Sequence, residues 1–216
     1  MLRRHLLAAA LVAAATPAFG QAYPSKPITL IVPFAAGGPT DLLARILGER
    51  MGKELGQQFI IENVTGAAGT IAMVKLVRAA PDGYTIGIGH VGTNVANAAI
   101  YTKLGVDLIG DLEPIARLPA NPMLVVSSNN VPAKTLKELV EYLKANPDKV
   151  SGGTAGIGSG SHLGALAFNK ATGVSYQLVP YRGTGPAMQD LIGNQIQVMV
   201  DQSSNSLPQV QAGKIR

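Results

Sequence analysis

The chain has 216 residues, of which 47% are hydrophobic and 14% are charged, and its formal net charge is +5. This composition describes one large globular domain or two small ones with an apolar core, and it excludes a disordered chain. The absence of cysteine excludes disulfides and thiolate metal sites. The mild positive charge, without a Lys/Arg cluster, argues against nucleic acid as a partner.

Residues 1–22 have the pattern of a secretory signal peptide. Two arginines and a histidine open the segment, an apolar run follows over residues 6–15, and small residues precede Tyr23. The apolar run is too short for a stable membrane anchor. We therefore expect cleavage after Ala22, a mature net charge of +3 and a periplasmic location; a buried N-terminal helix is the alternative.

Strand-like and helix-like segments alternate in the first half of the mature chain. Short β-branched runs bounded by proline or glycine are typical of buried strands, and leucines at four-residue spacing are typical of a helix face. Strands are expected over 28–34, 58–62 and 84–90, and helices from Asp41 to Leu55 and over 71–79. This alternation predicts an α/β domain with a mostly parallel sheet.

A proline-rich break marks the middle of the chain. Residues 113–127 contain two strand-like runs separated by Pro119 and Pro122. Two prolines so close together end one element and start another. We therefore expect the chain to cross between domains here, with the first lobe over 23–118 and the second over 119–216.

The alternation resumes after this break. Thr135 and Glu138 form a capping box at the start of a helix that Asn146 and Pro147 end. Strands are expected over 149–153, 177–181 and 195–201, and helices over 161–171, 185–193 and 206–215. The last helix is followed by no further strand, which favours a fragment whose second lobe is incomplete.

Four glycine-rich turns follow strands and precede helices, at residues 35–41, 89–94, 153–162 and 181–187. Ligands of open α/β sheets bind at the carboxyl ends of strands, and a helix start offers free N–H groups and the positive end of the helix dipole. Such turns can hold a carboxylate or phosphate without a cationic side chain. The simpler interpretation is that they only connect strands to helices.

Enzyme motifs are weak in this sequence. Residues 87–92 match G-x-G-x-x-G, but they follow the third strand and no suitably placed acid ends a later strand. There is no P-loop and no G-x-S-x-G, and His90 and His162 lack zinc-site spacing. Asp41 and Asp201 suit a helix cap or a strand end as well as a ligand contact. We therefore expect no catalytic residues, no metal and no cofactor.

Several blocks in this order resemble one receptor family. They are YPSKPITLIVPFAAGGPTD at residues 23–41, ENVTGAAGTIA, AAPDGYTI, LVPYRGTGPAMQDLIGNQIQVMVD and LPQVQAGKIR. The chain resembles, over residues 23–216, the solute receptors of tripartite tricarboxylate transporters (the Bug/TctC-like family). The resemblance implies a periplasmic α/β protein of the two-lobed type II (Venus-flytrap) architecture, each lobe a mostly parallel sheet flanked by helices. It also implies a monomer that closes on a small di- or tricarboxylate and delivers it to a membrane permease.

The resemblance implies ligand contacts from the strand-to-helix turns of both lobes. The first lobe would contribute Phe34, Gly38, Thr40, Asp41, Gly92 and Thr93. The second lobe would contribute Thr154, Gly158, Ser159, Ser161, His162, Tyr181, Arg182, Gly183 and Asp201. This chain has NVTGAAG at residues 63–69 where the family usually has N-R-P-G-A-G-G, so no arginine contact is implied there. Docking of the closed receptor on a sensor kinase or chemoreceptor, and an exported hydrolase, are the alternative functions.

Overall fold

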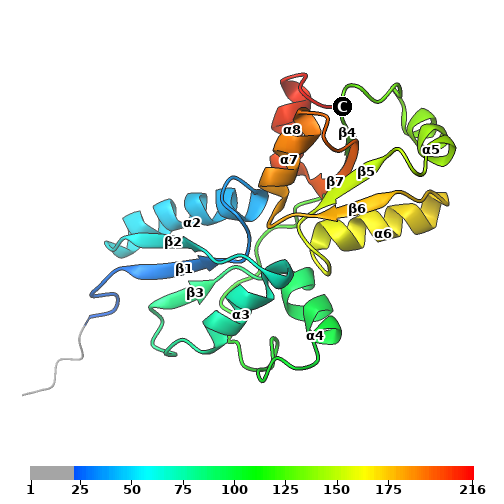
Figure 1. Ribbon diagram of the computed structural model, residues 1–216. Coiled ribbons are helices and arrows are strands. Elements are labelled where there is room, and N and C mark those ends of the chain that lie inside the picture. The colour runs from blue at the N-terminus through cyan, green and yellow to red at the C-terminus, as the bar shows by residue number, and fades with distance from the viewer. Residues whose placement is uncertain (1–21) are drawn as a thin grey trace, which may run out of the picture.

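The computed structural model describes residues 22–216 and contains two α/β units, each built on its own sheet (Figure 1). The predicted signal peptide, up to residue 21, lies outside the described residues. We use N-lobe for the part built on the sheet β2-β1-β3 and C-lobe for the part built on the sheet β4-β7-β5-β6. The two lobes lie side by side, with the turns at the ends of their strands directed toward each other (Figure 1).

The N-lobe sheet is parallel throughout. Its central strand β1 (Ile28–Val32) pairs with β2 (Phe59–Asn63) on one side and with β3 (Thr85–Gly87) on the other. Successive side chains of a strand point to opposite faces, and helices α2 (Pro39–Leu55) and α3 (Thr70–Val77) supply the two packing surfaces. These packing surfaces account for the buried apolar run from Leu30 to Val32 in β1.

The core of the N-lobe shows this division directly. Leu30 and Val32 pack with Ala44 of α2, whereas Ile31 packs with Met73 of α3 and with Leu108. All six side chains are at most 2% exposed. The predicted alternation of strands and helices is thereby confirmed in this half of the chain.

Local chemistry explains where the N-lobe differs from the sequence prediction. Helix α2 begins at Pro39 rather than Asp41, because a proline suits the first helical position, where its missing N–H is not needed. The 3₁₀ turn η1 (Ala67–Gly69), the π-helix η2 (Val91–Ala96) and the short helix α4 (Asn97–Ile100) were not predicted. Their small and polar residues carry no clear hydrophobic period.

The C-lobe has four strands and four helices in its described part. The strands are β4 (Met123–Ser127), β5 (Ser151–Thr154), β6 (Gln177–Pro180) and β7 (Val198–Gln202). The helices are α5 (Leu136–Ala145), α6 (Gly160–Thr172), α7 (Thr184–Ile192) and α8 (Ser203–Gln211). β5 pairs in parallel with β6 and β7, and β4 pairs antiparallel with β7. The expectation of a mostly parallel sheet is confirmed.

Strand β7 separates the two halves of the C-lobe core. Val198 packs in one cluster with Leu139 and Leu143 of α5, while Met199 packs in the other with Leu191 of α7. The start of α5 is the one that the capping box predicts, because the Thr135 hydroxyl accepts a hydrogen bond from the Glu138 amide at 3.2 Å.

Three sequence predictions in the C-terminal half are wrong in detail. Residues 113–118 form no strand, and Ile115 in this segment is 76% exposed; among the described residues no strand pairs with it. β7 begins at residue 198 rather than 195, because Asn194 adopts a left-handed conformation (φ 58°) in a turn. The last helix covers 203–211 instead of 206–215, and Ile215 is buried in a bridge to Ser128.

Candidate functional site

The four glycine-rich turns meet in pairs across the boundary between the lobes. A Cβ atom built on Gly185 would lie 2.9 Å from the amide nitrogen of Gly38, and one on Gly92 would lie 2.9 Å from that of Gly160. The Ala35 amide donates a hydrogen bond of 2.9 Å to the Arg182 carbonyl. Glycine therefore allows backbone-to-backbone contact between the lobes, which are in a closed arrangement.

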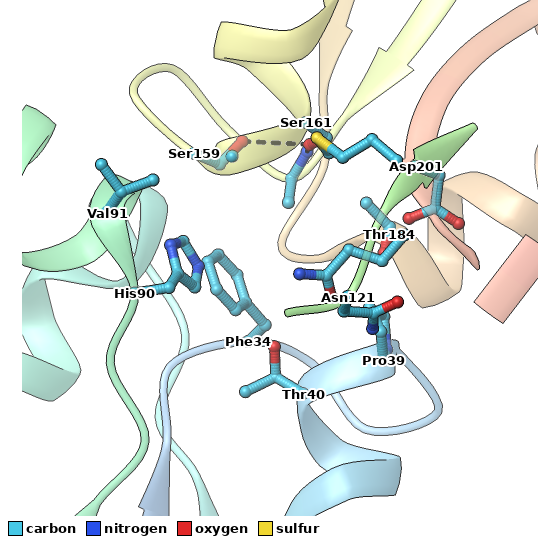
Figure 2. Close-up of a pocket in the computed structure, with 14 residues that line it drawn as sticks. Phe34, Pro39, Thr40, His90, Val91, Asn121, Ser159, Ser161, Thr184 and Asp201 are labelled. Atoms are coloured by element: carbon cyan, nitrogen blue, oxygen red, sulfur yellow. Dashed lines mark hydrogen bonds between the residues drawn. The ribbon is translucent and has the colours of Figure 1, made fainter. Parts of the chain in front are cut away.

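A cavity of about 190 Å³ lies between these turns (Figure 2). It is smaller than the ~300–1,000 Å³ pockets that hold drug-sized ligands, which favours a small solute. Both lobes contribute to its wall. The lining residues are Phe34, Pro39, Thr40, His90, Val91, Asn121, Met123, Ala155, Ser159, Gly160, Ser161, Thr184, Asp201 and Gln202.

The starts of five helices converge on this cavity. Pro39 and Thr40 open α2, Val91 opens η2, Gly160 opens α6 and Thr184 opens α7. Gln202 is the residue before α8, and it lines the cavity as well. The first turn of a helix has unpaired backbone N–H groups and the positive end of the helix dipole. The arrangement is therefore suited to an anion, as the sequence analysis expected of the turns.

The side chains around the cavity add little charge of their own. No lysine or arginine is among its lining residues. Burial lowers the pKa of His90 to about 4, so the imidazole is neutral at neutral pH. Burial also raises the pKa of Asp201, against the hydrogen bonds from Ser206 and Asn205 that favour its ionised form. Attraction of an anion therefore has to come from neutral donors: backbone N–H groups, hydroxyls and side-chain amides.

Two serines organise the turn before α6. Ser159 is the N-cap of α6, and its hydroxyl accepts a hydrogen bond from the His162 amide at 3.3 Å. The Ser161 hydroxyl accepts from the Ala155 amide at 2.8 Å and lies 3.1 Å from the Ser159 hydroxyl. Both serines are at most 4% exposed. The pair holds the turn in place beside the cavity.

The N-lobe side of the cavity is walled by two stacked rings. The Phe34 ring and the His90 imidazole are nearly parallel, 6° apart, with centroids separated by 5.4 Å (Figure 2). His90 Nδ1 accepts a hydrogen bond from the Gly92 amide at 2.9 Å. Thr93 completes this cap, because its hydroxyl accepts from the His90 amide at 2.9 Å. His90 therefore caps η2 and presents an apolar ring face.

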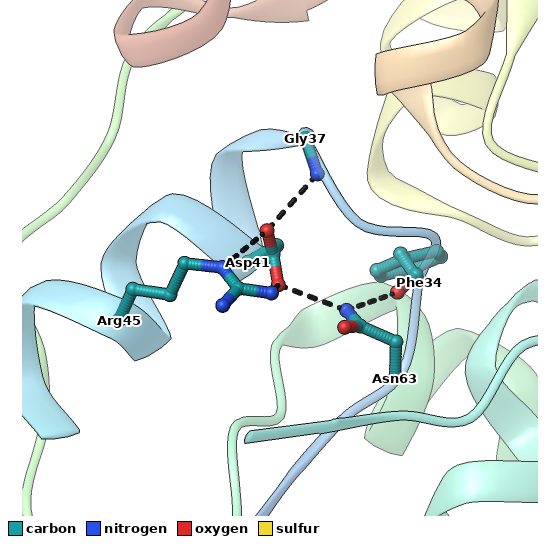
Figure 3. A network of polar contacts seen from close by, with 5 residues as sticks. All are labelled: Phe34, Gly37, Asp41, Arg45 and Asn63. Atoms are coloured by element: carbon teal, nitrogen blue, oxygen red, sulfur yellow. Dashed lines mark hydrogen bonds and ion pairs between the residues drawn. The ribbon is translucent and has the colours of Figure 1, made fainter. Parts of the chain in front are cut away.

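Asp41 does not line the cavity; instead it ties the first glycine turn to the sheet (Figure 3). Its Oδ2 accepts hydrogen bonds from the Gly37 amide and from Arg45 Nε, each at 3.0 Å. Its Oδ1 accepts from Arg45 Nη2 and from Asn63 Nδ2, also at 3.0 Å. Burial opposes ionisation of Asp41, yet these hydrogen bonds hold the pKa of its carboxyl below the usual value. The carboxylate positions the turn.

Asn63 extends the same connection to the aromatic wall. Its Nδ2 also donates to the Phe34 carbonyl at 2.9 Å, so one amide group joins the end of β2 to both Asp41 and Phe34. The network runs from the surface arginine Arg45, through Asp41 and Asn63, to the cavity wall (Figure 3). It holds the first turn in one shape before any solute arrives.

The predicted site residues fall into three groups. Five line the cavity: Phe34, Thr40, Ser159, Ser161 and Asp201. Two line a second cavity of about 240 Å³, which shares Phe34 and Ala155 with the first: Tyr181 and Arg182. The remaining eight line neither: Gly38, Asp41, Gly92, Thr93, Thr154, Gly158, His162 and Gly183. Ligand contact by any of the fifteen stays a prediction.

The residues outside the cavity shape the turns around it. A Cβ on Gly183 would lie 3.0 Å from the Ala35 amide nitrogen, so this glycine also belongs to the contact between lobes. The Thr154 hydroxyl faces the Gly156 amide at 3.4 Å, and His162 Nδ1 faces the Gly158 amide at the same distance. The Tyr181 hydroxyl donates to Asp190 at 2.6 Å, so it is already engaged within its own lobe.

Nine lining residues were not predicted: Pro39, His90, Val91, Asn121, Met123, Ala155, Gly160, Thr184 and Gln202. Six of them belong to the four glycine turns, so extending the prediction to every residue of those turns would have found them. Asn121 and Met123 come from the proline-rich crossing, where the sequence carries no signal for a binding site. Gln202 follows Asp201 in the chain.

Within residues 22–216, no three His, Asp or Glu side chains are grouped closely enough to hold a metal ion. In the same range, no helix has both the length and the apolar character that crossing a bilayer requires.

Two α/β lobes that close over a cavity at the starts of their helices define the class of two-lobed solute-binding proteins. The sequence profile of the tripartite tricarboxylate transporter family receptor (TctC) matches residues 43–216. The chain is also 38% identical over 217 residues to a UPF0065 protein of Agrobacterium vitis, and 36% identical over 216 residues to one of Bordetella pertussis. The chain therefore belongs to the TctC receptor family.

The match covers 99% and 100% of this chain but 62% and 66% of these two relatives. The chain thus spans under two thirds of the length of each of these two relatives. The family is one of solute-binding receptors, and the predicted family resemblance is confirmed.

Solved structures agree with this family and with the predicted fold class. The periplasmic binding protein BugD is 43% identical and superposes with a TM-score of 0.86, covering 90% of this chain and 64% of its own. MatC of Rhodopseudomonas palustris, solved with bound malate, is 40% identical with a TM-score of 0.84, over 90% and 66%. A TctC solute-binding protein from Polaromonas, solved without ligand, is 31% identical with a TM-score of 0.55, over 90% and 66%.

Proposed function

We propose that this protein captures a small organic acid between its two lobes, as the receptor of a tripartite tricarboxylate-type transporter. The observation that carries the proposal is the convergence of five helix starts on one cavity with no lysine or arginine in its lining. The helix dipoles, and the first-turn N–H groups that the caps at Gly92, His162 and Ser204 do not use, favour a carboxylate there without a cationic side chain.

The chemistry of the lining supports a di- or tricarboxylate or a similar carboxylate. Buried hydroxyls of Thr40, Ser159 and Thr184 border the cavity from three different helix starts. Grouped donors of this kind can hold more than one carboxylate oxygen. A relative that is 40% identical, MatC, was solved with malate, which has two carboxylates.

Hinge closure between the lobes is the proposed mechanism of capture. The glycine pairs bring the lobes into backbone contact, and the Ala35–Arg182 hydrogen bond joins them directly. Supporting this, the chain superposes with a TM-score of 0.84 on the malate-bound relative and of 0.55 on the relative without ligand. A solute that contacts both lobes would favour the closed arrangement, because only that arrangement offers both sets of donors.

The wider setting follows from the family and is part of the proposal. The protein would act in the periplasm after removal of a signal peptide at residues 1–22. It would divide into lobes at residues 23–118 and 119–216 and work as a monomer. It would deliver its ligand to the permease subunits in the membrane, without nucleic acid, metal or cofactor. The relatives' membership in a periplasmic receptor family supports this setting.

Isothermal titration of the purified protein tests the proposal. The panel contains mono-, di- and tricarboxylates of two to six carbons, with a neutral sugar and the diamine putrescine as controls for solutes that lack a carboxylate. We expect saturable binding of at least one carboxylate and none of the two controls. Folded protein that binds no organic acid, or binds the controls equally well, contradicts the proposal.

A further inference from the structure

Asp201 has one carboxylate oxygen that the protein leaves unpaired at the cavity. The residue lies in β7, opposite Leu124 of β4, is fully buried, and lines the cavity beside Thr184 (Figure 2). Its Oδ2 accepts hydrogen bonds from Asn205 Nδ2 at 2.6 Å and from Ser206 Oγ at 2.8 Å. Its Oδ1 has no hydrogen-bond partner among the described residues.

This asymmetry points to a missing donor. Buried polar atoms are paired in the great majority of cases, and a buried carboxylate oxygen without a partner is strongly unfavourable. The two donors on Oδ2 and the start of α8, two residues further along the chain, favour the ionised form of Asp201. Burial opposes ionisation and raises the pKa of the Asp201 carboxyl. In the ionised carboxylate, Oδ1 can only accept a hydrogen bond.

The surroundings of Oδ1 offer little competition. No lysine or arginine lines the cavity. The Thr184 hydroxyl and the Gln202 amide also favour the ionised form of Asp201, but neither makes a hydrogen bond to Oδ1. Asn121 is engaged with the start of α8, because its Oδ1 accepts from the Ser203 hydroxyl and its Nδ2 donates to the Ser204 hydroxyl. A donor for Asp201 is thus best supplied by the solute.

A second carboxylate of the solute would be a poor neighbour for Asp201, because two like charges at contact distance repel in a buried site. The solute's carboxylates belong at the helix starts, and a hydrogen-bond donor on its carbon skeleton belongs at Asp201. We propose that Asp201 determines specificity: its Oδ1 accepts a hydrogen bond from a hydroxyl or protonated amine beside a carboxylate. The ligand class is then a hydroxy- or amino-substituted acid, and this inference rests on the proposed carboxylate-binding function.

Titration with three four-carbon acids tests the inference, because they differ at one position. Malate has a hydroxyl, aspartate a protonated amine, and succinate neither. We expect malate or aspartate to bind at least about tenfold more tightly than succinate, since a hydrogen bond to a charged acceptor is lost with succinate. Preference for malate or for aspartate tells which donor the site takes.

The variant Asp201→Asn tests whether Asp201 causes the preference for malate or aspartate over succinate. The amide removes the charge with little change in shape, and we expect the affinity ratio to succinate to fall to about threefold or less. Ser206→Ala is the matched control: it removes a partner of Oδ2 and leaves Oδ1 untouched, so the ratio should persist. A ratio retained in Asp201→Asn overturns the inference.

The outcomes separate the two proposals. If succinate binds the unchanged protein as tightly as malate and aspartate, Asp201 does not select the ligand, whereas the carboxylate-binding function stands. If no organic acid binds, both fail. Thermal unfolding shows whether each variant is folded; should Asp201→Asn not fold, the three affinities of the unchanged protein decide alone.

Discussion

Gly38 and Gly185 face each other across the boundary between the lobes, so closely that a Cβ atom on Gly185 would lie 2.9 Å from the Gly38 amide nitrogen. Gly38 precedes α2 of the N-lobe, and Gly185 lies in the first turn of α7 of the C-lobe. The closed arrangement therefore depends on the absence of a side chain at this point.

A side chain at position 185 should hold the lobes apart. We expect Gly185→Val to weaken carboxylate binding at least about tenfold, since a ligand-bound state that is disfavoured by only 1.4 kcal/mol loses that much affinity. Small-angle X-ray scattering with saturating ligand should show a larger radius of gyration than the unchanged protein has. Gly193→Ala, at the far end of α7, is the control, because its nearest neighbour is a carbonyl of its own helix at 3.3 Å. Equal compaction of both variants would contradict the prediction.

The network around Asp41 should contribute more to stability than its exposed ion pair does. In Asp41→Ala the Gly37 amide and the half-buried Asn63 amide group lose their charged acceptor, and we expect a loss of about 1–3 kcal/mol in the free energy of unfolding. Arg45→Ala should cost under about 1 kcal/mol, because the Arg45 side chain is 54% exposed. Urea denaturation measures both. Equal losses in the two variants would show that Asp41 contributes to stability through its ion pair with Arg45 and not through its hydrogen bonds to the turn.

His90 should make the protein sensitive to mild acid. Its pKa is lowered from 6.5 to about 4 by burial, so the unfolded chain takes up a proton between these values and the folded chain does not. The contribution of neutral His90 to the free energy of unfolding is fully present above pH 6.5 and is lost as the pH falls toward 4. It amounts to at most about 3 kcal/mol. Asn can accept the same hydrogen bond from Gly92 without titrating.

Urea denaturation of the unchanged protein and of His90→Asn at pH 7 and pH 4.5 checks this. The unchanged protein should lose more stability between the two pH values than the variant does. The buried carboxyls are common to both proteins and cancel in the comparison. Identical losses would mean that His90 takes up its proton without unfolding.

Hydroxyls that line the cavity should contribute to ligand binding, whereas hydroxyls that only cap a helix elsewhere should contribute to stability alone. Thr184 lines the cavity at the start of α7, whereas Thr135 caps α5 and lines neither cavity. We expect Thr184→Val to weaken carboxylate binding about tenfold, and Thr135→Val to leave binding unchanged while lowering stability by about 1 kcal/mol. Titration and thermal unfolding of both variants check the pair. Unchanged affinity in Thr184→Val would remove that hydroxyl from the proposed site.

Much of the fold follows from local sequence alone. The buried run of β1, the leucine spacing of α2 and the capping box at Thr135 each specify one element through periodicity or hydrogen-bond chemistry that acts within a few residues. The alternation of such elements predicts parallel sheets, and the glycine turns predict where a ligand would bind. The strand expected over 113–118 failed because a strand also needs a neighbour to pair with.

The tertiary structure decided which side chains reach the cavity. Asp41 and Asp201 are both acids beside predicted turns or strand ends, yet Asp41 is saturated by Gly37, Arg45 and Asn63, while Asp201 keeps an oxygen unpaired. That difference depends on partners as many as 22 positions away in the chain, which no local pattern encodes. The sequence by itself determined the elements and the turns, because these obey short-range rules. Only the packing of one lobe against the other determined which turns pair and what they enclose.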